Sequence, residues 1–154
     1  MKSQPAAVVK FTAWTAIVGA VFAYLNLVFV GMVVGDDIDA TLHGATMLSL
    51  STDARWLMRL SMLSDILGFY LPVIVIAGFL WNSFREEAGA LGDMAALAIA
   101  AYVVVGISGA AIMTATLDPL ARLHAGGDNV VMSATEAAWT AISYACQKGL
   151  WWIE

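Results

Sequence analysis

The 154-residue sequence is poor in charge and has a single cysteine. Charged residues make up 12% of the chain, against roughly 25% in an ordinary soluble domain. Lysine and arginine form no basic tract, so we expect no nucleic-acid partner. Cys146 has no cysteine with which to form an internal disulfide, supports neither a zinc nor an iron–sulfur site, and is interpreted as a small buried apolar residue. We therefore expect no cofactor.

Hydrophobic residues are abundant instead, at 61% of the chain, with a mean hydropathy of +0.82. They concentrate in three runs, 11–35, 60–81 and 94–116. As a helix, each run is long enough to cross the hydrocarbon core of a bilayer, which is about 30 Å thick. A backbone in lipid must satisfy its own hydrogen bonds, so each run should be helical. The sequence thus predicts an all-α polytopic transmembrane helix bundle, with residues 1–154 as a single integral membrane domain.

The segment 134–153 has two interpretations. Its length matches a bilayer, and Trp151 and Trp152 resemble an interfacial aromatic belt, which favours a fourth span. However, polar residues recur at i, i+4, i+7 and i+11 along one side, namely Glu136, Thr140, Ser143 and Gln147. Such a stripe faces a partner helix or a water-filled cavity, or lies in the membrane interface. An interfacial helix is therefore the alternative.

The connections are expected to be short. Segment 39–51 predicts a helix along the membrane surface that begins at Asp39, and Asp53 is expected to cap the helix that becomes the second span. Further breaks in helical structure are expected at 82–92, 117–119 and 126–128, where acidic residues, glycine or proline interrupt the apolar pattern.

Residues 35–120 carry a resemblance to a known family. The residues concerned are Gly35-Asp36, the alanine-, threonine- and leucine-rich segment that ends at Ser51, and the run from Arg59 to Tyr70. They resemble a family of bacterial membrane proteins that is defined only as a domain of unknown function. The resemblance implies a six-helix protein, with further spans expected where this chain ends. It implies no activity, substrate or cofactor.

The basic residues indicate an orientation. Lys2, Lys10 and Arg85 fall on one side of the predicted bundle, whereas Arg55, Arg59 and Arg122 fall on the other. Under the positive-inside rule this distribution favours a bacterial cytoplasmic-membrane protein with its N-terminus inside.

Asp65 is the most unusual residue, because it lies about 9 Å inside the second run. Its predicted face at helical spacing comprises Ser61, Asp65, Gly68 and Pro72. Pro72 leaves the carbonyl of Gly68 without its helical partner, so this face offers an acid, a hydroxyl and an open carbonyl. These groups predict an ion or proton site. The alternative is that Asp65 pairs with Arg59 or Arg55, or hydrogen-bonds a neighbouring helix.

Other polar and small residues within the runs predict helix packing. Asn26 is expected to join two helices by a hydrogen bond, or to contribute to a polar seam with Asp65. Gly106 and Ala110 have small-xxx-small spacing, and Gly109 lies on the same part of the helix. This pattern predicts close backbone approach, either within the chain or between chains.

The two histidines follow acidic residues in similar segments. His43 and His124 each lie six residues after an aspartate, Asp37 and Asp118. If the two segments met, both histidines, Asp39 and Asp118 would offer ligands for a divalent metal. The compact spacing of zinc motifs is absent, so this metal site is a minor hypothesis.

Three functions follow from these patterns. The first is an accessory or assembly subunit without catalysis, surrounded by membrane lipids and associated with its own copies or with other membrane subunits. The alternative is an ion, proton or small-solute transport unit that uses the polar seam around Asp65. The third is a metal-dependent enzyme that uses His43 and His124. No catalytic motif supports an enzyme.

Overall fold

The computed structural model describes residues 4–151, and over that range it is 92% helical without strands. The all-α prediction is confirmed. The elements in chain order are α1 (Ala6–Val34), the 3-10 helix η1 (Ile38–Leu42), α2 (Gly44–Leu48), α3 (Thr52–Asp65), the π-helix η2 (Ile66–Tyr70), α4 (Leu71–Gly126), α5 (Asn129–Tyr144) and the π-helix η3 (Ala145–Leu150). The predictions for Lys2 and Trp152 lie outside the described residues.

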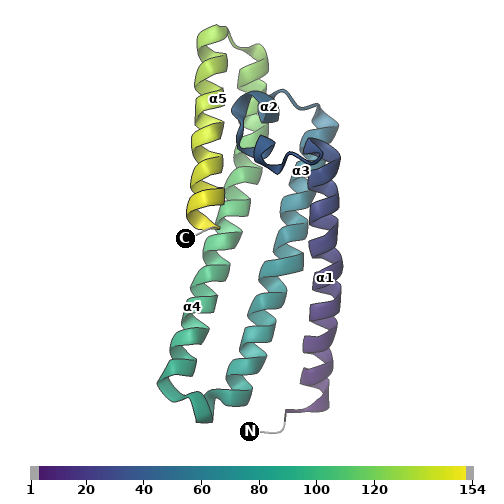
Figure 1. Ribbon diagram of the computed structural model, residues 1–154, viewed down its shortest axis with the longest axis vertical. Coiled ribbons are helices and arrows are strands. Elements are labelled where there is room, and N and C mark those ends of the chain that lie inside the picture. The colour runs from purple at the N-terminus through teal and green to yellow at the C-terminus, as the bar shows by residue number, and fades with distance from the viewer. Residues whose placement is uncertain (1–3, 152–154) are drawn as a thin grey trace.

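Long helices lie side by side along the molecule (Figure 1). α1 runs up one side, and α3, η2 and the first part of α4 run back beside it as one continuous helix. α4 then reverses direction and returns along the molecule. α5 and η3 fold back against the end of α4 and stop beside its middle, where Trp151 bonds to Gly106.

Two helices are long and apolar enough to cross a membrane, Ala6–Val34 and Thr52–Gly126. The second reverses at Gly89, whose φ of 52° and ψ of −135° lie outside the helical region. A positive φ is accessible to glycine because it has no Cβ. The predicted break in helical structure within 82–92 is therefore confirmed, and it is confined to Gly89. Good helix formers, such as Ala88 and Ala90, keep the chain helical on both sides of Gly89.

The predicted stop at 117–119 is wrong, because α4 continues through Pro119 to Gly126. The φ of proline is compatible with a helix, and the ring removes one backbone hydrogen bond. α4 ends at Gly126, with Gly127 as its C-cap, and the Asp128 side chain then accepts bonds from the amides of Val130 and Val131 to start α5. The predicted break at 126–128 is confirmed.

Segment 39–51 differs from the predicted surface helix. It forms η1 and α2 with a break at His43, and α5 packs over it, so that Thr41, Leu42 and Met47 are buried. Asp39 lies inside η1 and does not cap it. The N-cap of α3 is Ser51, whose side chain accepts from the Ala54 amide at 3.2 Å, so the expected cap at Asp53 is wrong.

The hydrophobic core lies where α2, α3, α4 and α5 meet. Its buried members are Met47, Leu48, Met58, Met113, Leu117, Ala121, Trp139 and Cys146. The burial predicted for Cys146 is confirmed. Trp139 belongs to this core rather than to an interface, and its indole donates to the Thr41 carbonyl at 3.1 Å.

The predicted small-residue packing occurs within the chain. A Cβ on Gly106 would lie 1.9 Å from the Tyr70 ring, and one on Gly109 would lie 2.5 Å from the Trp151 indole nitrogen. Ala110 is fully buried between them and the core. The two aromatic side chains therefore occupy the face that a second chain would otherwise approach.

Candidate functional site

A cavity of about 420 Å³ lies between the helices beside Asp65. It is lined from α1, η1, α3, η2, α4 and η3 by Asn26, Val30, Ile38, Thr41, Met58, Met62, Asp65, Phe69, Tyr70, Tyr102, Gln147 and Trp151. Its volume is within the range of about 300–1,000 Å³ that is typical of small-molecule sites. The structure thus joins Asp65, Asn26 and Gln147, three of the residues predicted for the polar seam.

Asp65 is the last residue of α3, directly before the π-helical turn η2. Within residues 4–151 its carboxylate has no hydrogen-bond or ion-pair partner. It lies close enough to the Tyr70 phenol to interact with it electrostatically. Asp65 is therefore an unpaired acid in a partly buried site.

The turn that positions Asp65 follows from Gly68 and Pro72. Pro72 has no amide hydrogen to complete the helical pattern with Gly68, and the chain forms a wide π turn there. Gly68 packs directly on α1, where an added Cβ would lie 2.2 Å from the Ala23 nitrogen. Gly68 therefore faces α1 rather than the cavity, contrary to the predicted seam.

Ser61 and Asn26 connect α1 to α3. The Asn26 side-chain amide donates to the Ser61 carbonyl at 2.8 Å, which confirms the predicted helix-joining bond. The Ser61 side chain is fully buried, and its hydroxyl donates to the Met58 carbonyl at 2.7 Å. Ser61 is therefore a packing residue, whereas the Asn26 side chain also reaches the cavity.

The polar stripe of the last helix divides between two places. Ser143 donates to the Leu42 carbonyl at 3.1 Å, and Thr140 accepts from the Gly44 amide at 3.2 Å. These two residues join α5 to η1 and α2. Gln147 continues to the cavity, where its amide nitrogen donates to the Thr41 hydroxyl at 3.0 Å.

Glu136, the remaining member of the stripe, lies away from the Asp65 cavity. Its carboxylate is 3.8 Å from Nε2 of His124, and it lines a separate pocket beside His43. The predicted continuous seam from Asp65 to Glu136 is therefore not formed. Most of the stripe instead faces η1 and α2, which form the segment that we predicted as a helix along the membrane surface.

Four aromatic side chains line the cavity near Asp65, and sequence reasoning missed them. Phe69, Tyr70 and Tyr102 form a cluster with ring centroids 5.3–6.3 Å apart. Trp151 comes from beyond η3, and its indole donates to the Gly106 carbonyl at 3.0 Å. Trp151 thus packs against α4 at Gly106, and its place in an interfacial belt stays a prediction. One feature of the sequence could have pointed to this aromatic lining, because Tyr70 and Tyr102 lie within apolar runs, away from the predicted interfaces.

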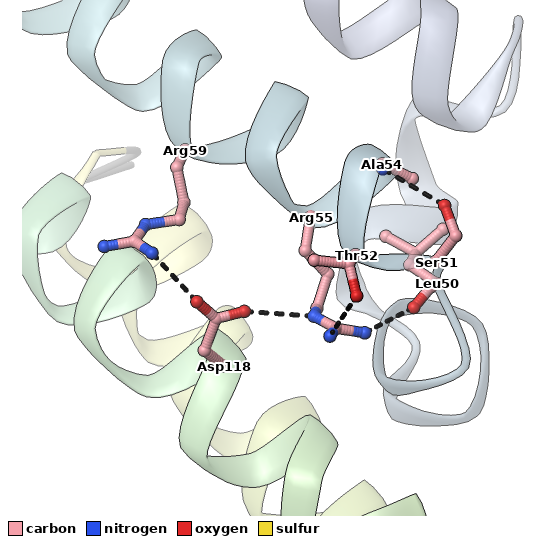
Figure 2. A network of polar contacts seen from close by, with 7 residues as sticks. All are labelled: Leu50, Ser51, Thr52, Ala54, Arg55, Arg59 and Asp118. Carbon is pink, nitrogen blue, oxygen red and sulfur yellow. Dashed lines mark hydrogen bonds and ion pairs between the residues drawn. The ribbon is translucent and has the colours of Figure 1, made fainter.

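Asp118 forms ion pairs with both arginines that the sequence offered as partners of Asp65, Arg55 and Arg59 (Figure 2). Arg55 Nε is 3.0 Å from one Asp118 oxygen, and Arg59 Nη1 is 2.8 Å from the other. The Arg55 guanidinium also bonds the Leu50 carbonyl and the Thr52 hydroxyl. The alternative interpretation, in which Asp65 pairs with Arg55 or Arg59, is therefore wrong.

The four side chains of the metal hypothesis are not brought together. Asp118 binds the arginines, and the buried His124 lies 3.3 Å from the Thr135 hydroxyl. His43 is exposed in a different pocket, and Asp39 lies in η1. Between residues 4 and 151, no group of three His, Cys, Asp or Glu side chains is placed to hold a metal ion.

The cavity therefore presents one carboxylate, two side-chain amides, a hydroxyl pair on the tyrosines and several aromatic faces. Comparisons of the chain with protein-family models, with curated proteins and with solved structures gave no match. The family resemblance over 35–120 stays a prediction, and the geometry of the cavity is the basis for the functional argument.

Proposed function

We propose that this protein is an integral membrane protein of three spans that transports a proton or a small positively charged solute by way of Asp65. The spans are α1, the continuous helix from α3 into the first part of α4, and the second part of α4. The observation that carries the proposal is the unpaired Asp65 carboxylate in a cavity between these helices.

The distribution of exposed side chains supports a lipid environment. On α1, large apolar residues such as Ile17, Val21 and Leu27 are more than half exposed. An apolar surface of this kind is rare on a soluble monomer and is expected where lipid covers a helix.

Two polar layers agree with the dimensions of a bilayer. Asp118 with its arginines forms one layer, and Asp93, which accepts from the Trp81 indole and pairs with Arg85, forms the other. Along α4 these layers are about 37 Å apart, which places them in the headgroup regions that flank a hydrocarbon core of about 30 Å. Lys10 and Arg85 favour the second layer as the cytoplasmic side of a bacterial inner membrane.

α5 and η3 begin beyond the Asp118 layer and descend about 18 Å below it to Trp151, the neighbour of Gly106. In the proposed arrangement they form a half-span rather than the fourth span. η3, Trp151 and η1 line the Asp65 cavity on the outer side in this arrangement.

The energetic argument concerns Asp65. It lies about 9 Å below Arg59 along the helix, at a depth where an ionised carboxylate is costly. A carboxylate in such surroundings either takes up a proton or binds a cation. An acid that exchanges these states inside a membrane is the usual component of a proton or cation pathway.

The experiment is a flux assay with purified protein in liposomes. A membrane potential drives ions inward, and a pH-sensitive dye inside the vesicles measures proton entry while a second series measures monovalent cation uptake. We expect protein-dependent flux that Asp65→Asn abolishes. The matched control is Asp93→Asn, which removes an acid outside the cavity and should retain flux. Absence of flux with the unaltered protein, or equal flux in both variants, contradicts the proposal.

An accessory or assembly subunit is the second proposal. It is favoured by α1, whose outer surface is a continuous apolar face available to another membrane helix. The Gly106 face no longer supports it, because Tyr70 and Trp151 cover that face within the chain. Cross-linking in native membranes should then capture a second chain at Leu27, and recovery of uncross-linked monomer counts against it.

A further inference from the structure

We infer that the solute bound beside Asp65 is a small alkylammonium ion, held by the carboxylate and by a cage of aromatic rings. The inference rests on the proposed function for the location of the cavity in a membrane, and it adds the chemical class of the ligand. Two independent features support it, namely the polarity of the lining atoms and the aromatic cluster.

The only charged side chain among the described lining residues is the Asp65 carboxylate, which accepts hydrogen bonds. Asn26 and Gln147 each donate one amide hydrogen, to the Ser61 carbonyl and to the Thr41 hydroxyl, and the Asn26 side-chain oxygen has no donor of its own among the described residues. The Thr41 hydroxyl donates to the Ile38 carbonyl at 2.8 Å. No lysine, arginine or histidine is among the described lining residues. Such a lining suits a ligand that carries positive charge and donates hydrogen bonds.

Tyr70 adds an observation of its own. The residue is 4% exposed and lines the cavity, and its hydroxyl has no hydrogen-bond partner within the described part of the chain. Every fully buried side-chain oxygen among the described residues has a partner, so the Tyr70 hydroxyl is open to the cavity. The Tyr70 hydroxyl and the Asp65 carboxylate are therefore two unused polar groups on neighbouring turns, directed at the same space.

The aromatic rings distinguish an organic cation from a metal ion. Phe69, Tyr70, Tyr102 and Trp151 line one cavity with Asp65, and aromatic faces attract ammonium groups through their quadrupoles. Mg²⁺ and Ca²⁺ sites in proteins are built mainly on carboxylates, and Asp65 is the one carboxylate among the described lining residues. A cavity of about 420 Å³ also accommodates an organic molecule rather than a single ion.

The same ammonium chemistry occurs in free solutes and in the headgroups of phosphatidylcholine and phosphatidylethanolamine. The test therefore starts in maltoside micelles, which carry no amine. Choline is titrated into the protein and binding heat is measured, in parallel with the uncharged carbon isostere of choline. We expect choline to bind at least about tenfold more tightly than the isostere, because the isostere loses both the ion pair and the cation–π contacts.

Two pairs of variants identify the groups responsible. Asp65→Asn should weaken choline binding about tenfold or more, whereas Asp93→Asn should not change it. Tyr102→Leu removes one ring of the cage and should weaken binding about three- to tenfold, whereas Tyr24→Leu, on the exposed face of α1, is its control. The Asp65 carboxylate bonds no other described residue, so Asp65→Asn should keep the helical circular dichroism and elution volume of the unaltered protein.

Lipid is then added to separate the two sources of ammonium. Competition by phosphatidylcholine or phosphatidylethanolamine but not by phosphatidylglycerol assigns the site to a headgroup, and competition by none of the three lipids assigns it to a free solute. Absence of choline binding, equal binding of the isostere, or unchanged binding in folded Asp65→Asn overturns the inference. Proton flux that depends on Asp65, without choline binding, supports the proposed function and contradicts the alkylammonium site. Choline binding without flux supports the alkylammonium site and contradicts the proposed function.

Discussion

The Arg55–Asp118–Arg59 network makes the sharpest prediction about stability (Figure 2). We consider Asp118→Asn, which keeps the size of the side chain and removes its charge. The network joins α3 to α4, and Arg55 also ties the α2–α3 connection to it through Leu50. Loss of the carboxylate therefore loosens three segments at one end of the bundle.

The exposure of each side chain sets the magnitude. The Arg55 and Asp118 side chains are 17% and 29% exposed, so this contact resembles a hydrogen bond between partly buried charged groups, worth about 1.5–3 kcal/mol. The Arg59 side chain is 41% exposed, and water screens its contact, which contributes at most about 1 kcal/mol. We expect Asp118→Asn to lower the free energy of unfolding by about 2–3 kcal/mol.

Asp93→Asn is the matched control. Asp93 also pairs with an arginine, Arg85, at 3.2 Å, but the two side chains are 46% and 57% exposed. A pair so open to solvent stabilises by about 0–1 kcal/mol. The two aspartates are thus equivalent as sequence features and unequal in the structure.

Reversible unfolding by SDS in mixed micelles, followed by far-UV circular dichroism, measures both changes. The arginines provide an internal check: Arg55→Gln should destabilise more than Arg59→Gln, because the Arg55 guanidinium also bonds Leu50 and Thr52. Equal small losses for Asp118→Asn and Asp93→Asn, or a larger loss for Arg59→Gln than for Arg55→Gln, would refute the reasoning from burial.

Two further pairs of substitutions test the packing. Gly68→Ala should lower the free energy of unfolding by about 1–3 kcal/mol in the same assay, because its Cβ meets the α1 backbone, whereas Gly78→Ala, with open space around it, should leave stability unchanged or raise it by up to about 1 kcal/mol. Equal effects contradict the close approach at Gly68. Trp139→Phe should cost about 2–3 kcal/mol, since it leaves a cavity in the core and an unpaired Thr41 carbonyl. Trp14→Phe, on the exposed face of α1, should stay within about 0.5 kcal/mol, and a comparable loss there would show that burial does not decide the difference.

The predicted breaks in helical structure show where local reasoning succeeds and where it fails. The break expected within 82–92 occurs at Gly89, whereas Pro119 does not interrupt α4 as expected. The helix passes Pro119 because packing against α5 and the arginine pairs of Asp118 hold that region together. The reversal is confined to Gly89, since a single residue with positive φ is sufficient to turn the chain.

The candidate site divides in a similar way. Asp65 and Asn26 stand out in the sequence because a polar side chain in an apolar run is costly and therefore conspicuous. Tyr70, Tyr102 and Trp151 do not stand out, because aromatic residues are common in such runs. Their convergence depends on the reversal at Gly89 and on the return of η3 along α4.

Composition and the length of the apolar runs were sufficient to predict that this chain is helical and that it has helices able to span a membrane, because both properties depend on transfer energies that add along the chain. The assignment of partners was a matter of tertiary structure. Asp118 rather than Asp65 receives the arginines, and Asp65 is left to line a cavity, because helix directions and the reach of each side chain set those distances. Pair contacts between distant segments have no local signature, and here they define the site.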